Sequence, residues 1–132
     1  MIDDMDLLDE IYFALKTNDR FCELVGRPKT TQLWEEKIRR EICPDDEVSA
    51  SKLNFISIYL SSATETDNVY VSRSFLNVDY YCKSRIECRE MKRIVKSVLE
   101  DMGMFCTSMY NTASGIKGVY KYTQKYRPLV WA

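Results

Sequence analysis

The side chains that most often carry out acid–base chemistry and bind metals are scarce in this sequence. The chain has no histidine, which removes Ser/His/Asp and Cys/His nucleophile arrangements and the commonest ligand of transition metals. An enzyme built on this chain would have to use carboxylates, lysine or a bare thiol. We therefore expect a protein with no catalytic residue, no cofactor and no bound metal ion.

Three short patterns imitate chemical motifs without the surroundings that those motifs need. Ser114 and Lys117 have the Ser-x-x-Lys spacing, but that motif acts at a helix start in a much larger fold, and here it spans a predicted turn. Asp45 with Glu90 and Lys92 imitates a metal-dependent nuclease, yet Glu90 and Lys92 fall on a predicted helix instead of a strand. Residues 115–118 are too short for a phosphate loop. We interpret all three as ordinary structural or solvated residues.

A fourth pattern concerns nucleic acid. Residues 117–122 read Lys-Gly-Val-Tyr-Lys-Tyr, a basic residue and a glycine before aromatic rings that could stack on bases. Val119 replaces an expected aromatic residue, however, and the net charge of −1 gives no overall basic field. Alternating tyrosines more often form cross-strand pairs or a subunit interface. The tyrosines that share this face are therefore candidates for a subunit interface, namely Tyr120, Tyr122 and Tyr126.

Length, cysteine usage and hydropathy indicate the class of protein. The chain has 132 residues, 45% hydrophobic and 30% charged, which suits one globular domain over residues 1–132. The five cysteines are widely spaced without a Cys-x-x-Cys pair, so we predict free thiols, mostly in the core, in a reducing cytoplasm. No apolar run approaches the roughly 18 residues of a membrane span, and the acidic start is unlike a signal peptide.

The elements that must position these residues begin with the strongest helix signal, residues 84–103. Ser84 and Glu87 fit a capping box, and Gly103 can supply the left-handed exit. The apolar residues recur at helical spacing, namely Met91, Ile94, Val95, Val98, Leu99 and Met102. This stripe predicts a long amphipathic helix that covers a sheet.

The remaining patterns predict the rest of an α+β domain. Helices are expected from Asp3 or Asp4 to Thr17 and over residues 19–25 and 33–42. Alternation predicts strands over residues 55–61, 69–82, 104–110 and 117–127. The expected fold is thus a mainly antiparallel sheet of about four strands packed against one long amphipathic helix, with additional N-terminal helices.

Charge is divided unevenly along the chain. The first ten residues contain five acids and no base, whereas residues 111–132 contain four bases and no acid. Unlike ends of neighbouring copies could therefore meet in an oligomer, although such charges can equally be solvated.

A resemblance to one family rests on the order of several segments. These are Leu-Leu-Asp-Glu-Ile-Tyr at 7–12, Glu-Leu-Val-Gly at 23–26, Asn-Phe-Ile-Ser-Ile-Tyr at 54–59, Asn-Val-Asp-Tyr-Tyr-Cys-Lys at 77–83, Leu-Glu-Asp-Met-Gly at 99–103, Ser-Gly-Ile-Lys at 114–117 and Tyr-Arg-Pro-Leu at 126–129. Over nearly the whole chain this order resembles the tail terminator, or tail-to-head joining (tail completion), proteins of long-tailed bacteriophages and prophages. The resemblance is one of order and pattern, without a diagnostic motif.

The resemblance implies a structural component of the virion, at the head-proximal end of the tail, that is assembled in the host cytoplasm. Such proteins form a ring, typically a hexamer, that caps the tail tube, ends its polymerisation and docks to the head connector. The implied partners are other copies of the chain, the major tail tube protein and the head–tail connector protein, with DNA passing through without specific binding. A head-completion or stopper protein of the connector is the alternative, and a small nucleic-acid-binding domain is less favoured.

Two polar connections, residues 62–68 and 111–116, are the predicted contact segments for the tube or the connector, since loops that extend from a sheet often carry binding residues. The candidate residues are Thr64, Glu65, Thr66, Asp67, Asn111, Thr112, Ser114 and Lys117. Residues 33–52 are more helical and more charged than the short extended segment that the family would have there. Their role is left open by the sequence.

Overall fold

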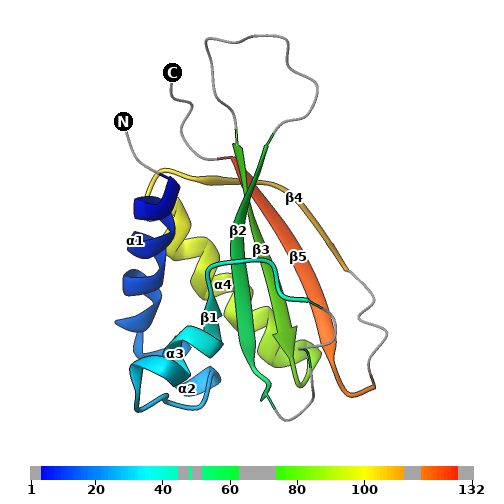
Figure 1. Ribbon diagram of the computed structural model, residues 1–132. Helices are drawn as coiled ribbons and strands as arrows, with labels where there is room; N and C mark the ends of the chain where they lie inside the picture. The colour runs from blue at the N-terminus through cyan, green and yellow to red at the C-terminus, as the bar shows by residue number, and fades with distance from the viewer. Residues whose placement is uncertain (1–3, 45–47, 49–51, 63–73, 112–116, 128–132) are drawn as a thin grey trace, which may run out of the picture.

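The computed structural model describes residues 4–44, 48, 52–62, 74–111 and 117–127, which form an α+β fold (Figure 1). Helices and strands follow one another as α1 (Asp4–Lys16), α2 (Asp19–Leu24), α3 (Thr31–Lys37), β1 (Ile38–Arg39), β2 (Phe55–Ser62), β3 (Ser74–Cys82), α4 (Arg85–Asp101), β4 (Phe105–Asn111) and β5 (Tyr120–Arg127). The first part of the predicted strand 69–82 lies outside the described residues. The last predicted strand begins later than expected because Gly118 has a φ of 83°, a turn conformation that is not compatible with a regular strand.

The sheet has five strands in the order β1-β2-β3-β5-β4. Three of the pairings are antiparallel, whereas β1 pairs with β2 in parallel. The prediction of about four antiparallel strands is therefore correct for β2 to β5 and missed β1. The expected helix over residues 33–42 is wrong beyond Lys37, because Ile38 and Arg39 pair with Ile56 and Ser57. A strand of two residues is too short to show alternation in the sequence.

Helix α4 begins and ends as its sequence predicts. The Ser84 hydroxyl accepts a hydrogen bond from the Glu87 N–H at 3.2 Å and donates to the Glu87 carboxylate at 3.3 Å. At the other end Gly103 has a φ of 88°, and the Met104 N–H donates to the Leu99 carbonyl at 2.9 Å. This is a Schellman motif, with the C-terminal carbonyls satisfied by the residues that follow.

The main core lies between α4 and one face of the sheet. The helix buries its inward stripe of Cys88, Met91, Val95 and Leu99. The strands contribute their own apolar alternation, namely Ile56, Ile58, Leu76, Val78 and Tyr80. In Figure 1, α4 lies behind the sheet, and α1 to α3 lie beyond the β1 edge. Their apolar residues continue the same core, among them Ile11, Leu15, Phe21 and Trp34.

The other face of the sheet is covered in part by the chain that follows β1. Cys43, Val48 and Leu53 pack with Phe55 and Tyr81 in a second, smaller cluster, and those two rings stack with centroids 4.6 Å apart. Figure 1 shows this segment crossing in front of the strands. Of the segment whose role was open in the sequence, Cys43 and Val48 therefore cover part of the outer face of the sheet.

The side chain of Asn54, the residue before β2, forms hydrogen bonds with two other parts of the fold. Its side chain is buried; the amide donates to the Leu24 carbonyl at 2.8 Å and the oxygen accepts from the Lys83 N–H at 2.8 Å. One side chain thereby pairs a carbonyl at the end of α2 and an N–H at the entry to α4.

Candidate functional site

Of the eight residues predicted to contact the tube or the connector, the structure describes two, Asn111 and Lys117. Thr64, Glu65, Thr66, Asp67, Thr112 and Ser114 lie outside the described residues. Asn111 is the last residue of β4, and Lys117 is exposed in the turn before β5.

Strand register places the ends of the two predicted contact segments at opposite ends of the sheet. Ser62 pairs with Ser74 where β2 ends and β3 begins. Asn111 pairs with Tyr122, which pairs in turn with Tyr80, and Tyr80 lies opposite Ile56 at the other end of β2. The six steps along the strand from Ile56 to Ser62 span roughly 20 Å at the rise of a strand. The strand ends that flank the two predicted contact segments therefore lie at opposite ends of the sheet.

Tyr126 is the one interface candidate that the structure contradicts. Its side chain is fully buried, and its hydroxyl donates to the Gln124 side-chain oxygen at 3.0 Å, which also accepts from Tyr80 at 2.5 Å. Burial raises the pKa of both tyrosines above the ordinary value of 10.0. Because Tyr126 belongs to the core beneath α4, it cannot contact a neighbouring subunit without unfolding its own.

Tyr120 and Tyr122 are half-buried between β5 and α4. The Lys92 ammonium lies over the Tyr122 ring, 3.8 Å from its centroid, a cation–π contact. In an RNA-binding strand the aromatic rings must face outward to stack on bases. Here the helix covers the face that the tyrosines share, so the arrangement does not favour base stacking, and interface roles for Tyr120 and Tyr122 stay predictions.

The two lateral sides of the sheet carry exposed apolar residues that the sequence patterns did not single out. Strand β4 is an edge of the sheet, and on it Phe105 is 66% exposed and Met109 is 50% exposed. On the opposite side, Phe13 of α1, Leu33 of α3 and Ile42 after β1 are also exposed. An edge strand and exposed large apolar side chains are both features of association surfaces.

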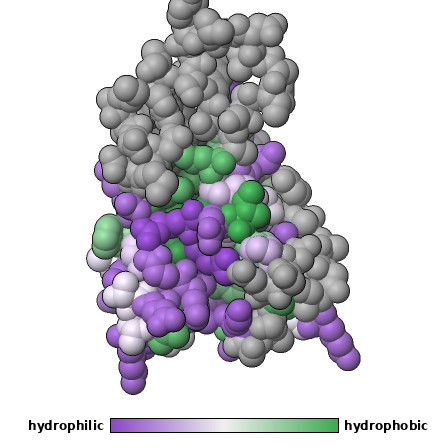
Figure 2. Space-filling model, in the orientation of Figure 1, coloured by the Kyte–Doolittle hydropathy of each residue, from purple (hydrophilic) through white to green (hydrophobic). Residues whose placement is uncertain are grey.

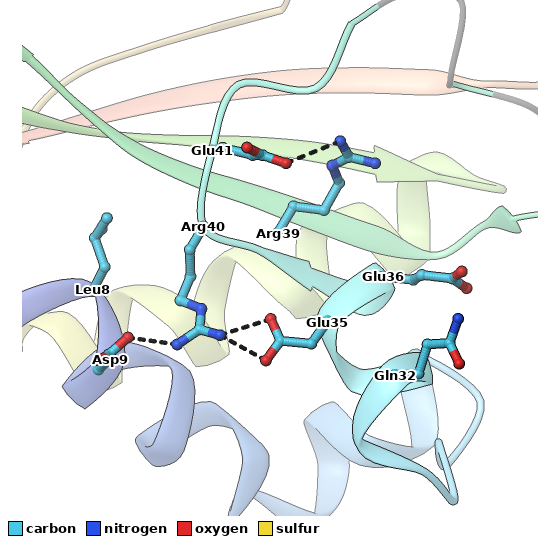
Figure 3. Close-up of a pocket in the computed structure, with 8 residues that line it drawn as sticks. All are labelled: Leu8, Asp9, Gln32, Glu35, Glu36, Arg39, Arg40 and Glu41. Atoms are coloured by element: carbon cyan, nitrogen blue, oxygen red, sulfur yellow. Dashed lines mark hydrogen bonds and ion pairs between the residues drawn. The ribbon is translucent and has the colours of Figure 1, made fainter. Parts of the chain in front are cut away.

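A cavity of about 610 Å³ lies on the N-terminal side, between α1, α3 and β1 (Figure 3). The Arg40 guanidinium donates to Asp9 and, at 2.6 Å, to both oxygens of Glu35; Arg39 lies 3.5 Å from Glu41. Figure 2 shows hydrophilic residues gathered over this side of the molecule. Since carboxylates engage both arginines, we interpret the network as a brace that holds α1 and α3 against β1.

A smaller cavity of about 240 Å³ lies between α4 and β5. Its lining consists of Arg85, Cys88, Arg89, Lys92, Tyr120 and Tyr122, so basic and aromatic side chains surround a buried thiol. A hydrogen bond with Cys82 and the nearby Lys92 charge lower the pKa of Cys88, while that hydrogen bond and burial raise the pKa of Cys82. In the sequence, the signal for this site is the spacing of its three basic residues on one helix face.

The remaining described side chains offer little that resembles a catalytic centre. In the part of the chain that the structure describes, no group of three His, Cys, Asp or Glu residues could hold a metal ion. Glu90 lies on α4 as expected and is held by Arg20 at 2.5 Å, whereas Asp45 is outside the described residues. All five cysteines are free thiols, as predicted.

The structure gives surfaces on which the chain could bind partners, whereas the comparisons add no relative. Among the described helices, none combines the length and the apolar character that crossing a membrane requires. The geometry identifies a sheet with two distinct ends, two distinct lateral sides and a basic groove. No protein-family model and no curated protein matches this chain.

Proposed function

We propose that the chain is a structural subunit of the tail of a long-tailed bacteriophage. In this proposal copies of the chain form a ring on the last ring of the tail tube, six-membered by analogy with the family that the sequence resembles. The ring ends polymerisation of the tube and offers the docking surface for the head connector, without catalysis. The order of the segments over nearly the whole sequence and the α+β fold support the proposal.

The observation that supports the proposal is that the strand ends beside the two predicted contact segments lie at opposite ends of the sheet. A subunit that ends one assembly and begins another needs two separate surfaces, one for each partner. Stacked rings grow through a heterologous interface, so occupying its open side stops growth. One end of the sheet would then contact the tube, and the other end would contact the connector. The end with Asn111 and Lys117 can take either of these two roles.

The lateral sides of the subunit support association into a ring. A closed ring uses two unlike surfaces of each copy, and here the β4 edge and the α1–α3 side both expose apolar residues. The charges are also complementary: Lys121, Lys125 and Arg127 lie on β5 next to β4, whereas Asp9 and Glu10, acids of the first ten residues, lie on α1. The division of charge noted in the sequence thus corresponds to two sides of the fold.

The alternative, a stopper protein of the head–tail connector, would use the same two-ended subunit. The two functions differ in the partner that each end of the sheet contacts. Binding of purified tail tubes would favour the terminator, whereas binding of connectors alone would favour the stopper. In either case we expect DNA to pass through the ring without specific binding.

The decisive experiment is the absolute mass of the purified protein by light scattering, over a range of concentrations and at two salt levels, with and without tail tubes. We expect a discrete ring, or a monomer that becomes a ring on the tubes, and tubes that stop growing when the protein is added. Lys117→Glu should reduce binding to tubes or connectors, whereas Lys96→Glu on α4 serves as the matched control. A monomer that neither assembles nor stops tube growth would refute the proposal.

A further inference from the structure

Three basic side chains on one face of α4 line the smaller cavity. Arg85, Arg89 and Lys92 have the spacing i, i+4, i+7, which places them one above another on the helix. The cavity is lined by these residues with Cys88 and two tyrosines, and no carboxylate is among them. In the described part of the chain, none of the three basic side chains forms an ion pair.

This arrangement is unfavourable for the isolated protein. Like charges four residues apart on a helix repel each other, and positive charge in the first turns opposes the helix dipole. Two arginines elsewhere in the fold are neutralised: Arg20 contacts Glu23 and Glu90, and Arg40 contacts Asp9 and Glu35. The cavity lined by Arg85, Arg89 and Lys92, called the groove below, therefore carries positive charge that no acidic side chain among the described residues neutralises. A bound anion would neutralise it.

The donors in the groove indicate the class of anion. Arginine presents a planar fork of N–H groups that matches phosphate oxygens, and lysine adds a point charge. The first turn of a helix favours negative charge for the same reason that it disfavours Arg85. At about 240 Å³ the cavity is smaller than the roughly 300 to 1,000 Å³ of sites for drug-sized ligands. Its size therefore suits a single compact group.

We propose that the groove between α4 and β5 binds a phosphate group through Arg85, Arg89 and Lys92. The contact of Lys92 with the Tyr122 ring holds the ammonium in the lining of the groove. The phosphate can be a free ion or one phosphate of a nucleic-acid backbone, since both present the same oxygens. The inference does not depend on the proposed tail function.

The test is an NMR titration of the ¹⁵N-labelled full chain with inorganic phosphate and, separately, with a short single-stranded DNA. Chloride keeps the ionic strength constant, so that a site is distinguished from general screening. We expect saturable shifts at the amides of Cys88, Lys92 and Tyr122. Arg85→Gln combined with Arg89→Gln should weaken binding at least about tenfold, since two charge-assisted contacts are lost.

The matched control combines Arg93→Gln with Lys96→Gln. It removes the same charge from the same helix, at exposed positions that do not line the groove, and should leave binding unchanged. Lys92→Gln is a second, single variant that should also weaken binding. Loss confined to the groove variants supports the site, and the probe that binds identifies the source of the phosphate. Absence of saturable binding by both probes, or equal loss in both double variants, would overturn it.

Discussion

Replacing Phe105 by aspartate should disrupt association of the subunits. The side chain is 66% exposed on the edge strand β4, so of roughly 200 Å² of phenylalanine surface roughly 130 Å² is available to a neighbour. At about 25 cal/mol per Å² its burial is worth about 3 kcal/mol. Phe105→Asp loses this term and places a charge in the contact, and we expect each contact to weaken by about 100-fold.

The matched control is Ile86→Asp. Ile86 is 72% exposed and lies in the first turn of α4, on neither lateral edge of the sheet. Light scattering over a range of concentrations should show Phe105→Asp as a monomer where the unmodified chain and Ile86→Asp form the same ring. Circular dichroism and thermal unfolding confirm that each variant folds.

Equal behaviour of the two variants would refute the reasoning. If both still assembled, the β4 edge would not be the lateral contact; if both dissociated, added charge alone would explain the effect. A ring that survives Phe105→Asp but is lost in Tyr122→Ala would instead favour the half-buried tyrosines as the interface.

Three further predictions concern stability. Leu99→Ala removes a fully buried side chain of α4 and should lower the free energy of unfolding in urea by about 2 to 5 kcal/mol; a loss below about 1 kcal/mol would contradict this packing. Asn54→Ala leaves the Leu24 carbonyl and the Lys83 N–H without their partner and should lower the free energy of unfolding by about 1 to 3 kcal/mol; a loss below about 0.5 kcal/mol would contradict this role. Burial raises the pKa of Tyr80 and Tyr126, so above about pH 10 the unfolded chain releases protons that the folded chain keeps. Stability should therefore be complete below about pH 10 and fall above it, by at most about 2.7 kcal/mol per pH unit. Tyr126→Phe should roughly halve that slope, and a flat profile in alkali would disprove the assignment.

Long periodic segments were predictable because their signals are redundant. In α4 the cap, the apolar stripe and the terminal glycine agree, and the structure confirms all three. Strands β2 to β5 have enough residues for alternation to appear. By contrast β1 has two residues, and its place in the sheet depends on pairing with Ile56, a partner far along the chain. Local periodicity contains no information about pairing between residues that are far apart in the chain.

The functional surfaces were less predictable, since they depend on which face a residue occupies in the assembled sheet. The spacing of Tyr120, Tyr122 and Tyr126 correctly indicates one shared face, but it cannot say that α4 covers that face and buries Tyr126. Phe105 looks like an ordinary strand residue in the sequence. Its exposure follows from β4 lying at the edge, which is a property of strand order.

The order of the strands also bears on the kind of oligomer that can form. At one side of the sheet, β1 and the helices α1 to α3 cover the edge of β2, whereas at the other side β4 pairs with β5 alone among the described strands. Two copies could pair β4 with β4 about a two-fold axis, which would close a dimer and leave the α1–α3 side unused. Contact of β4 with the α1–α3 side of the next copy uses both apolar surfaces and continues until a ring closes. A mass of two subunits would therefore count against the ring, and any larger closed number would favour it.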